Sequence, residues 1–342
     1  MRKILCVLCL LLVCGGCSNK EKKDSEAYVI DAFPSVSEQG VYHIVKGKIG
    51  NQLYFYDGET NQDVPLCAKP NCDHNNNQCE AYLITQYKDT VMNYPPMPYE
   101  GKLYGVYMNM QTGNNYLCSM EEDGSDRKEI LKLTDGAIAS LMIYKNKAYI
   151  CLETFEHDEN GRIGRLAENY LTYIGDLTNG KLTQLDLDED SIVNFEGVWD
   201  KQVMYMTIKE ENDNVKGVLM SLSEDGKENK VFLDNMSTLN AFLYKGSIYS
   251  NDNQQIKKLD LKTKEEADVC QVHTDGCTLD SGVNDPFGLM RITCVKDNKF
   301  VKEIYVDLEK KQQVSIEGNI YTKYKDGYLV MDEQGLLKFV NE

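Results

Sequence analysis

The sequence has few long apolar stretches, and none beyond its N-terminal part could cross a membrane. After residue 16 there is no run of about 18 apolar residues, whereas a transmembrane helix needs about 20. The apolar run from Ile4 to Val13 is itself too short for that role. We therefore expect no transmembrane helix in the rest of the chain.

The sequence also lacks the short motifs of common enzyme classes. It contains no G-x-S-x-G, H-E-x-x-H, P-loop or G-x-G-x-x-G pattern, and it has only 4 histidines. These absences disfavour an enzyme whose catalytic residues lie close together in sequence. They do not bear on a site assembled from scattered loop residues, which would leave no such pattern.

Positive charge is scarce. The 37 lysines and arginines are outnumbered by 54 aspartates and glutamates, which gives a net charge of −17. An acidic surface repels phosphate backbones and anionic headgroups, so nucleic acid is excluded as an expected partner. Metal cations, cationic peptides and neutral glycans are compatible with this charge.

The first sixteen residues are typical of a signal peptide. Arg2 and Lys3 precede the apolar run, and Gly15-Gly16-Cys17 follows it. Two small residues before a cysteine resemble the cleavage site of lipoprotein signal peptidase, although Cys14 stands where leucine is usual. The alternative is an ordinary secretory signal with an incidental cysteine.

We predict a signal peptide over residues 1–16, lipidation of Cys17 and a polar, flexible tether over residues 17–27. Cleavage would remove Arg2 and Lys3 but no acidic residue, which lowers the net charge from −17 to −19. The chain is then expected at the cell membrane, on the extracytoplasmic face. The lipid would be its only contact with the membrane.

A repeat organises residues 28–342. A small or polar pair followed by an apolar residue and a large one, as in Gly101-Lys102-Leu103-Tyr104, recurs seven times at intervals of about 40 to 60 residues. After most copies comes an alternating apolar run that ends in an acidic turn, such as Leu53-Tyr54-Phe55-Tyr56-Asp57. Alternation with period two indicates half-buried strands.

Repeated units of this length, each with about four antiparallel strands, predict an all-β β-propeller. We expect seven blades, with six or eight as alternatives in number and stacked β-sandwich domains as the alternative fold. The last copy, from Ile320 to Val340, has room for three strands only. Tyr28 to Phe33 would complete it and close the ring.

Twelve cysteines are present, and eight of them follow the predicted tether. Four candidate ligands, with the spacing C-x4-C-x-H-x4-C, lie in a cysteine-rich insert at residues 67–82: Cys67, Cys72, His74 and Cys79. Outside the cytoplasm a disulfide is the favoured interpretation, and a structural zinc site or free thiols are the alternatives. A second disulfide is predicted between Cys270 and Cys277, whereas Cys118, Cys151 and Cys294 are expected to be buried thiols.

The segment from Pro65 to Tyr82, together with the lipobox-like N-terminus and the Leu-Tyr-Phe-Tyr-Asp strand, resembles surface lipoproteins of Gram-positive anaerobes. Their exported part is similar to the low-density-lipoprotein-receptor type of propeller. The receptor-type Tyr-Trp-Thr-Asp strand is absent, since the only tryptophan is Trp199. The resemblance implies a fold and a location but no activity.

Two functions are therefore carried forward. The first is a non-catalytic binding module at the cell surface, with a protein, peptide or glycan ligand and no cofactor other than a structural zinc ion. The second is an extracellular hydrolase or lyase that acts on glycan or peptide through propeller loops. The residues around the centre of the ring would distinguish them.

Overall fold

The computed structural model describes residues 28–30, 35–76, 78–82, 90–92, 94–159, 163–211, 214–236, 241–252, 254–284, 287–297 and 299–341. The predicted signal peptide, Cys17 and the tether lie outside these ranges. Within them every regular element is a β-strand, and no helix is long and apolar enough to span a bilayer.

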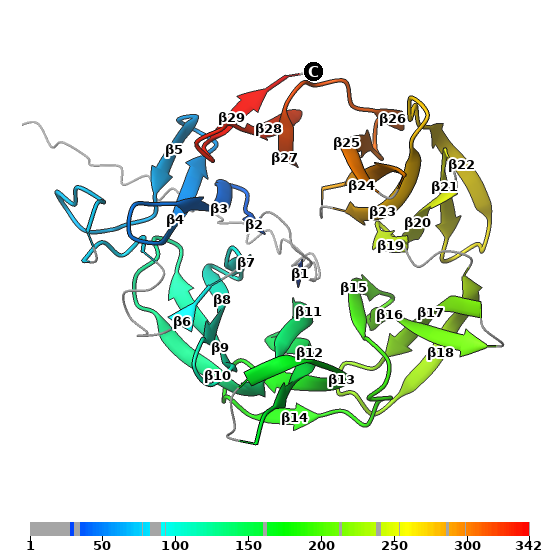
Figure 1. Ribbon diagram of the computed structural model, residues 1–342, viewed down its shortest axis with the longest axis horizontal. Coiled ribbons are helices and arrows are strands. Elements are labelled where there is room, and N and C mark those ends of the chain that lie inside the picture. The colour runs from blue at the N-terminus through cyan, green and yellow to red at the C-terminus, as the bar shows by residue number, and fades with distance from the viewer. Residues whose placement is uncertain are drawn as a thin grey trace, which may run out of the picture.

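The strands form seven antiparallel sheets arranged as a ring, which confirms the predicted all-β propeller (Figure 1). Blade 1 contains β2 (Ser35–Val36), β3 (Gly40–Lys46), β4 (Asn51–Asp57) and β5 (Gln62–Pro65). Blade 2 contains β6 (Thr90–Val91), β7 (Met97–Tyr99), β8 (Lys102–Asn109), β9 (Asn114–Glu121) and β10 (Lys128–Asp135). Blade 3 contains β11 (Ala137–Tyr144), β12 (Lys147–His157), β13 (Ile163–Asp176) and β14 (Leu182–Gln184), and is joined by β1 (Tyr28–Ile30).

The second half of the chain continues the same order around the ring. Blade 4 contains β15 (Asn194–Trp199), β16 (Gln202–Glu211), β17 (Asn214–Leu222) and β18 (Asn229–Met236). Blade 5 contains β19 (Ala241–Tyr244), β20 (Ser247–Asp252), β21 (Gln255–Asp260) and β22 (Glu266–Gln271). Blade 6 contains β23 (Thr278–Asn284), β24 (Leu289–Lys296), β25 (Lys299–Asp307) and β26 (Gln312–Gln313), and blade 7 contains β27 (Asn319–Tyr324), β28 (Gly327–Met331) and β29 (Leu337–Val340).

Turn chemistry explains the sequence repeat. Each recurring copy begins the second strand of a blade, and in blades 3 and 5 the two residues before that strand form a tight turn from the first strand. In blade 3 this turn is Lys145-Asn146, with φ of 47° and 58°, and in blade 5 it is Lys245-Gly246, with φ of 45° and 73°. Two consecutive positive φ angles are the requirement of the hairpin turn that matches strand twist.

An aspartate ends the third strand in several blades. In blade 3 the Asp176 carboxylate accepts the backbone N–H of Thr178 at 2.8 Å, and Gly180 adopts a φ of 71° to enter the outer strand. Other blades repeat the arrangement with Asp57, Asp260 and Asp307. The acidic turns of the sequence are therefore structural, because the carboxylate caps backbone groups that the turn leaves unpaired.

Packing between neighbouring blades supplies the core. The buried apolar residues fall into seven clusters that each join two adjacent blades, with an eighth in the cysteine-rich insert. One cluster, for example, packs Leu117 of β9 against Ile150 of β12, and both side chains are fully buried. Each blade thus depends on both neighbours for burial, as repeat architectures require.

The ring is closed differently from the prediction. The first three residues of the predicted closing segment, Tyr28–Ile30, form β1, which pairs with β11 of blade 3, so they do not complete blade 7. Phe33 lies outside the described residues. In the described residues blade 7 keeps three strands, and no strand is shared between the last and first blades.

Side chains close this seam instead. The Asp63 carboxylate of β5 accepts the backbone N–H of Leu337 in β29 at 2.8 Å, and it also contacts Nε2 of His43 in β3 at 2.8 Å. Tyr56 packs edge-on against Tyr324 across the same seam, with ring centroids 6.1 Å apart. Closure therefore rests on burial and a small polar network, because no backbone ladder crosses the seam.

Candidate functional site

The cysteine-rich insert follows β5 and lies at the outer rim of blade 1, to the left in Figure 1. Its two ends are held to β4. The backbone N–H of Leu66 donates to the carbonyl of Leu53 at 2.8 Å, and the N–H of Leu53 donates to the carbonyl of Ala81, also at 2.8 Å. The insert therefore begins and ends against one strand of a rigid blade, which constrains the residues between.

The four predicted side chains converge within the insert. One ligand atom each from Cys67, Cys72, His74 and Cys79 lies within 4.8 Å of all the others. The Nδ1 atom of His74 is 3.3 Å from the sulfur of Cys79. Cys79 is fully buried and the other three are partly buried. The structure thus brings together the whole set that the spacing identified, and its three thiols are unpaired.

A residue of blade 1 contacts the turn that carries His74. His74 has a φ of 53°, as do several other turn residues of the chain. Its carbonyl accepts a hydrogen bond from Nε2 of Gln52 at 2.9 Å. The backbone that carries the imidazole is therefore tied to β4 of blade 1.

The electrostatic environment differs between the thiols. Burial acts to raise the pKa of Cys67, but the backbone N–H groups of Lys69 and Glu80 donate to its sulfur and hold the pKa below its ordinary value. Burial raises the pKa of Cys79 to about 12. The two sulfurs therefore differ, because the pKa of Cys67 lies below that of an ordinary thiol and the pKa of Cys79 lies above it.

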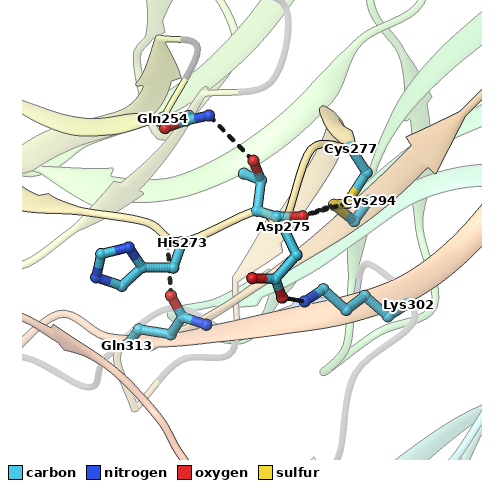
Figure 2. The surroundings of a disulfide bond; sticks show 8 residues. Gln254, His273, Asp275, Cys277, Cys294, Lys302 and Gln313 are labelled. Atoms are coloured by element: carbon cyan, nitrogen blue, oxygen red, sulfur yellow. Dashed lines mark hydrogen bonds and ion pairs between the residues drawn. A yellow bond between two sulfur atoms is a disulfide. The ribbon is translucent and has the colours of Figure 1, made fainter.

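The predicted disulfide between Cys270 and Cys277 is wrong. Cys277 instead pairs with Cys294, with their Cα atoms 5.8 Å apart, and Cys270 is a free thiol (Figure 2). The physical reason is strand register. Leu279 of β23 lies opposite Cys294 of β24, so Cys277, two residues before Leu279, lies close to Cys294 on the neighbouring strand of blade 6. Cys270 belongs to blade 5, where it pairs in register with Ile256. The expectation of a buried thiol holds for Cys118 and Cys151 but not for Cys294.

The connection that carries Cys277 is tied down on both sides. Nε2 of Gln254 donates to the hydroxyl of Thr274 at 3.0 Å, and Nζ of Lys302 contacts the Asp275 carboxylate at 2.6 Å (Figure 2). The backbone N–H of His273 donates to Oε1 of Gln313 at 2.9 Å. These contacts join blades 5 and 6 and give the segment a structural role.

The centre of the ring is occupied by the chain's own N-terminal strand. β1 pairs with β11 as the innermost strand of blade 3, and it lies beside the inner strands β7 of blade 2 and β15 of blade 4 (Figure 1). Nothing in the amino-acid sequence indicates this placement. A polar-to-apolar change after residue 27 marked the start of the domain but not the strand's partner.

The remaining histidines sit in separate surroundings. His43 is fully buried at the seam, and Nε2 of His157 contacts Asp135 at 2.6 Å at the surface. In the part of the chain that the structure describes, the cluster in the insert is the only group of three or more histidine, cysteine or acidic side chains placed to hold a metal ion. That cluster lies at the rim and not at the centre (Figure 1).

Comparison with known proteins gives the fold alone. No family profile and no curated protein sequence matches the chain. Among solved structures it is similar to oligogalacturonate lyase from Vibrio parahaemolyticus, with a TM-score of 0.53 and 10% identity over 92% of this chain and 89% of that one. The propeller domain of the trilobed protease from Pyrococcus furiosus gives a TM-score of 0.52 and 13% identity over 92% and 94%.

A prolyl endopeptidase is also similar, with a TM-score of 0.55 and 11% identity over 91% of this chain and 45% of that one. The trilobed-protease domain has an open velcro topology. Closure without a shared strand is also what the seam between blades 7 and 1 shows. At these identities the comparisons support a β-propeller and say nothing of chemistry.

Proposed function

We propose that this chain is a non-catalytic binding module, held by a lipid on Cys17 at the extracytoplasmic face of the cell membrane. The observation that carries the proposal is the position of β1. This strand follows the predicted tether directly and lies at the centre of the ring, among the inner strands of blades 2, 3 and 4. A catalytic site built from those inner strands would have to share that space with the chain's own backbone.

The direction of β1 supports one orientation of the proposed lipoprotein relative to the membrane. Tyr28 pairs with Ile143, beside the Lys145-Asn146 turn, and Ile30 pairs with Leu141 further from it. A tether that precedes Tyr28 therefore leaves on the face formed by the turns between first and second strands. Eleven residues of tether reach at most about 36 to 40 Å, so this face would lie toward the bilayer.

The opposite face carries the hairpins between second and third strands, and these would project away from the membrane. The longest are β12–β13 and β16–β17. The chain as a whole is acidic, with a net charge of −17 that becomes −19 after the predicted cleavage, which suits a neutral or cationic protein, peptide or glycan and disfavours an anionic one. Loops raised on a rigid scaffold are the usual place for such recognition.

Two experiments test the proposal. Cys17→Ala should leave the full chain unlipidated and its signal peptide uncleaved, as read from the intact mass, while Cys9→Ala, the matched control outside the Gly15-Gly16-Cys17 motif, should be cleaved and lipidated as the parent is. Equal lipidation and processing of the two variants would contradict the lipid anchor.

The second experiment separates binding from catalysis. Immobilised cell-wall glycan fragments and lysine-rich peptides are incubated with the purified chain, and both retention and product formation are measured. We expect saturable retention with the probe recovered unchanged, as judged by mass spectrometry. Repeated cleavage of any probe by less than one equivalent of protein would replace the binding module with a hydrolase or lyase.

A further inference from the structure

We propose that Cys67, Cys72, His74 and Cys79 form a structural zinc site that locks the insert onto the rim of the propeller. The proposal goes beyond the binding function and does not depend on it. It rests first on the geometry of the four ligand atoms. A tetrahedron with metal–sulfur bonds of about 2.3 Å has edges of about 3.8 Å, and the observed atoms lie within 4.8 Å of one another.

The donor set selects the cation. Three thiols and one imidazole are soft or borderline ligands, which suit zinc and do not suit calcium or magnesium. Four protein ligands fill the tetrahedral positions of zinc and leave none for a substrate. The site would therefore stabilise structure and would not perform catalysis.

A disulfide explains the arrangement less well. Three thiols cannot all be paired within the cluster, and the other free cysteines lie in separate strands: Cys118 in β9, Cys151 in β12 and Cys270 in β22. A disulfide would also give the imidazole no role. Yet the Nδ1 atom of His74 lies 3.3 Å from the sulfur of Cys79, and Gln52 holds the backbone carbonyl of His74.

The site would connect two blades. Next to Cys79, the carbonyl of Glu80 accepts a hydrogen bond from Nη2 of Arg127, which follows β9 of blade 2. Tyr82 forms an isolated bridge with Gln52 of blade 1. A metal ion that orders residues 67–82 would thereby fix the contacts between the first two blades at the outer rim.

The test uses the full lipoprotein, extracted in detergent under reducing, chelator-free conditions. Elemental analysis should find one zinc per chain. Cobalt added to the metal-free protein should produce the visible bands of a tetrahedral ion and a near-ultraviolet thiolate band. Cys72→Ser and His74→Ala should each weaken zinc binding by more than about 100-fold. Cys270→Ser, the matched control at a free thiol outside the cluster, should bind as the parent does.

Limited proteolysis supplies a second measurement. Chelation of the metal should expose residues 67–82 to cleavage, while the rest of the propeller resists, because the insert has little apolar content of its own to order it. If a ligand variant does not fold, the cobalt spectrum of the parent chain still decides. The proposal is overturned by a non-reduced peptide map with a disulfide among the three cysteines. It is equally overturned by free alkylation of all three without retained metal, or by full zinc binding in Cys72→Ser.

Discussion

Replacing Asp63 with alanine should open the ring at its seam. The Asp63 carboxylate is 5% exposed and contacts Nε2 of His43, whose side chain is 0% exposed. It also accepts the backbone N–H of Leu337, 2.8 Å away in the last blade. The substitution removes both interactions at once, and no ladder hydrogen bond crosses the seam in the described residues to compensate.

The magnitude follows from what is left unpaired. The Leu337 N–H and the His43 imidazole would each be buried without a partner, at about 1–3 kcal/mol apiece. We therefore expect Asp63→Ala to lower the free energy of unfolding by about 2–6 kcal/mol. Asp63→Asn should lose less, because its amide oxygen can still accept from Leu337.

Urea unfolding of the full chain measures the total loss, and hydrogen–deuterium exchange locates it. Exchange should accelerate in β29 and β5 before it does in blades 3 and 4. The control is Asp252→Ala, which removes a surface pair with Lys257 between side chains that are 52% and 39% exposed. That change should cost less than about 1 kcal/mol. A loss of similar size in both variants, with β29 exchange unchanged, would refute the view that Asp63 closes the ring.

Three further predictions concern blades 5 to 7. Lys323→Met should lower the free energy of unfolding, measured in urea, by about 3–5 kcal/mol. Asp307 is fully buried and would keep its hydrogen bond from Tyr328, but it would lose the ammonium group 3.0 Å away. An unchanged free energy of unfolding would contradict this prediction. Hydrogen bonds from Lys245 and Lys323 hold the pKa of Glu309 at about 2, so its contribution should be present above about pH 4.3 and disappear as pH falls toward 2. Glu309→Gln should thus lower the urea midpoint at pH 7 and not near pH 2, and an equal deficit at both pH values would exclude this linkage. Cys277→Ser should lower the free energy of unfolding by about 3 kcal/mol, because it releases a loop of 17 residues. A non-reduced peptide map of the parent chain should link Cys277 to Cys294. A link between Cys270 and Cys277 would instead support the pairing predicted from the sequence.

The propeller could be predicted because its signals are local and repeated. The same turn occurs at Lys145-Asn146 and at Lys245-Gly246 in two blades. Asp176 and Asp260 each end the third strand of their own blade. Each signal is weak alone, but a ring of blades needs the same turn at the same place in every unit. Repetition therefore replaced the long-range information that a single sequence lacks.

The pairing of β1 could not be predicted, because no repeated local signal specifies its partner strand. A strand of three residues carries no register information, and any exposed sheet edge offers it equivalent hydrogen bonds. The open outer edge of blade 7 and the inner edge of blade 3 were both available. The predicted disulfide between Cys270 and Cys277 was wrong for a similar reason, because strand register decides which cysteines meet. Cys270 and Cys277 are near in sequence, but the register of β23 against β24 brings Cys277 to Cys294.

The cysteine-rich insert could be predicted in part. Its four side chains could be named from spacing, because thiols and an imidazole within thirteen residues are close in any compact loop. The choice between disulfide and metal depends on directions, and these are imposed from elsewhere. Gln52 of β4 fixes the backbone of His74, and Arg127 of the next blade holds Glu80 beside Cys79. Residues distant in sequence thus hold the loop in which the four side chains meet, and that is why the metal hypothesis gains weight only once the blades are in place.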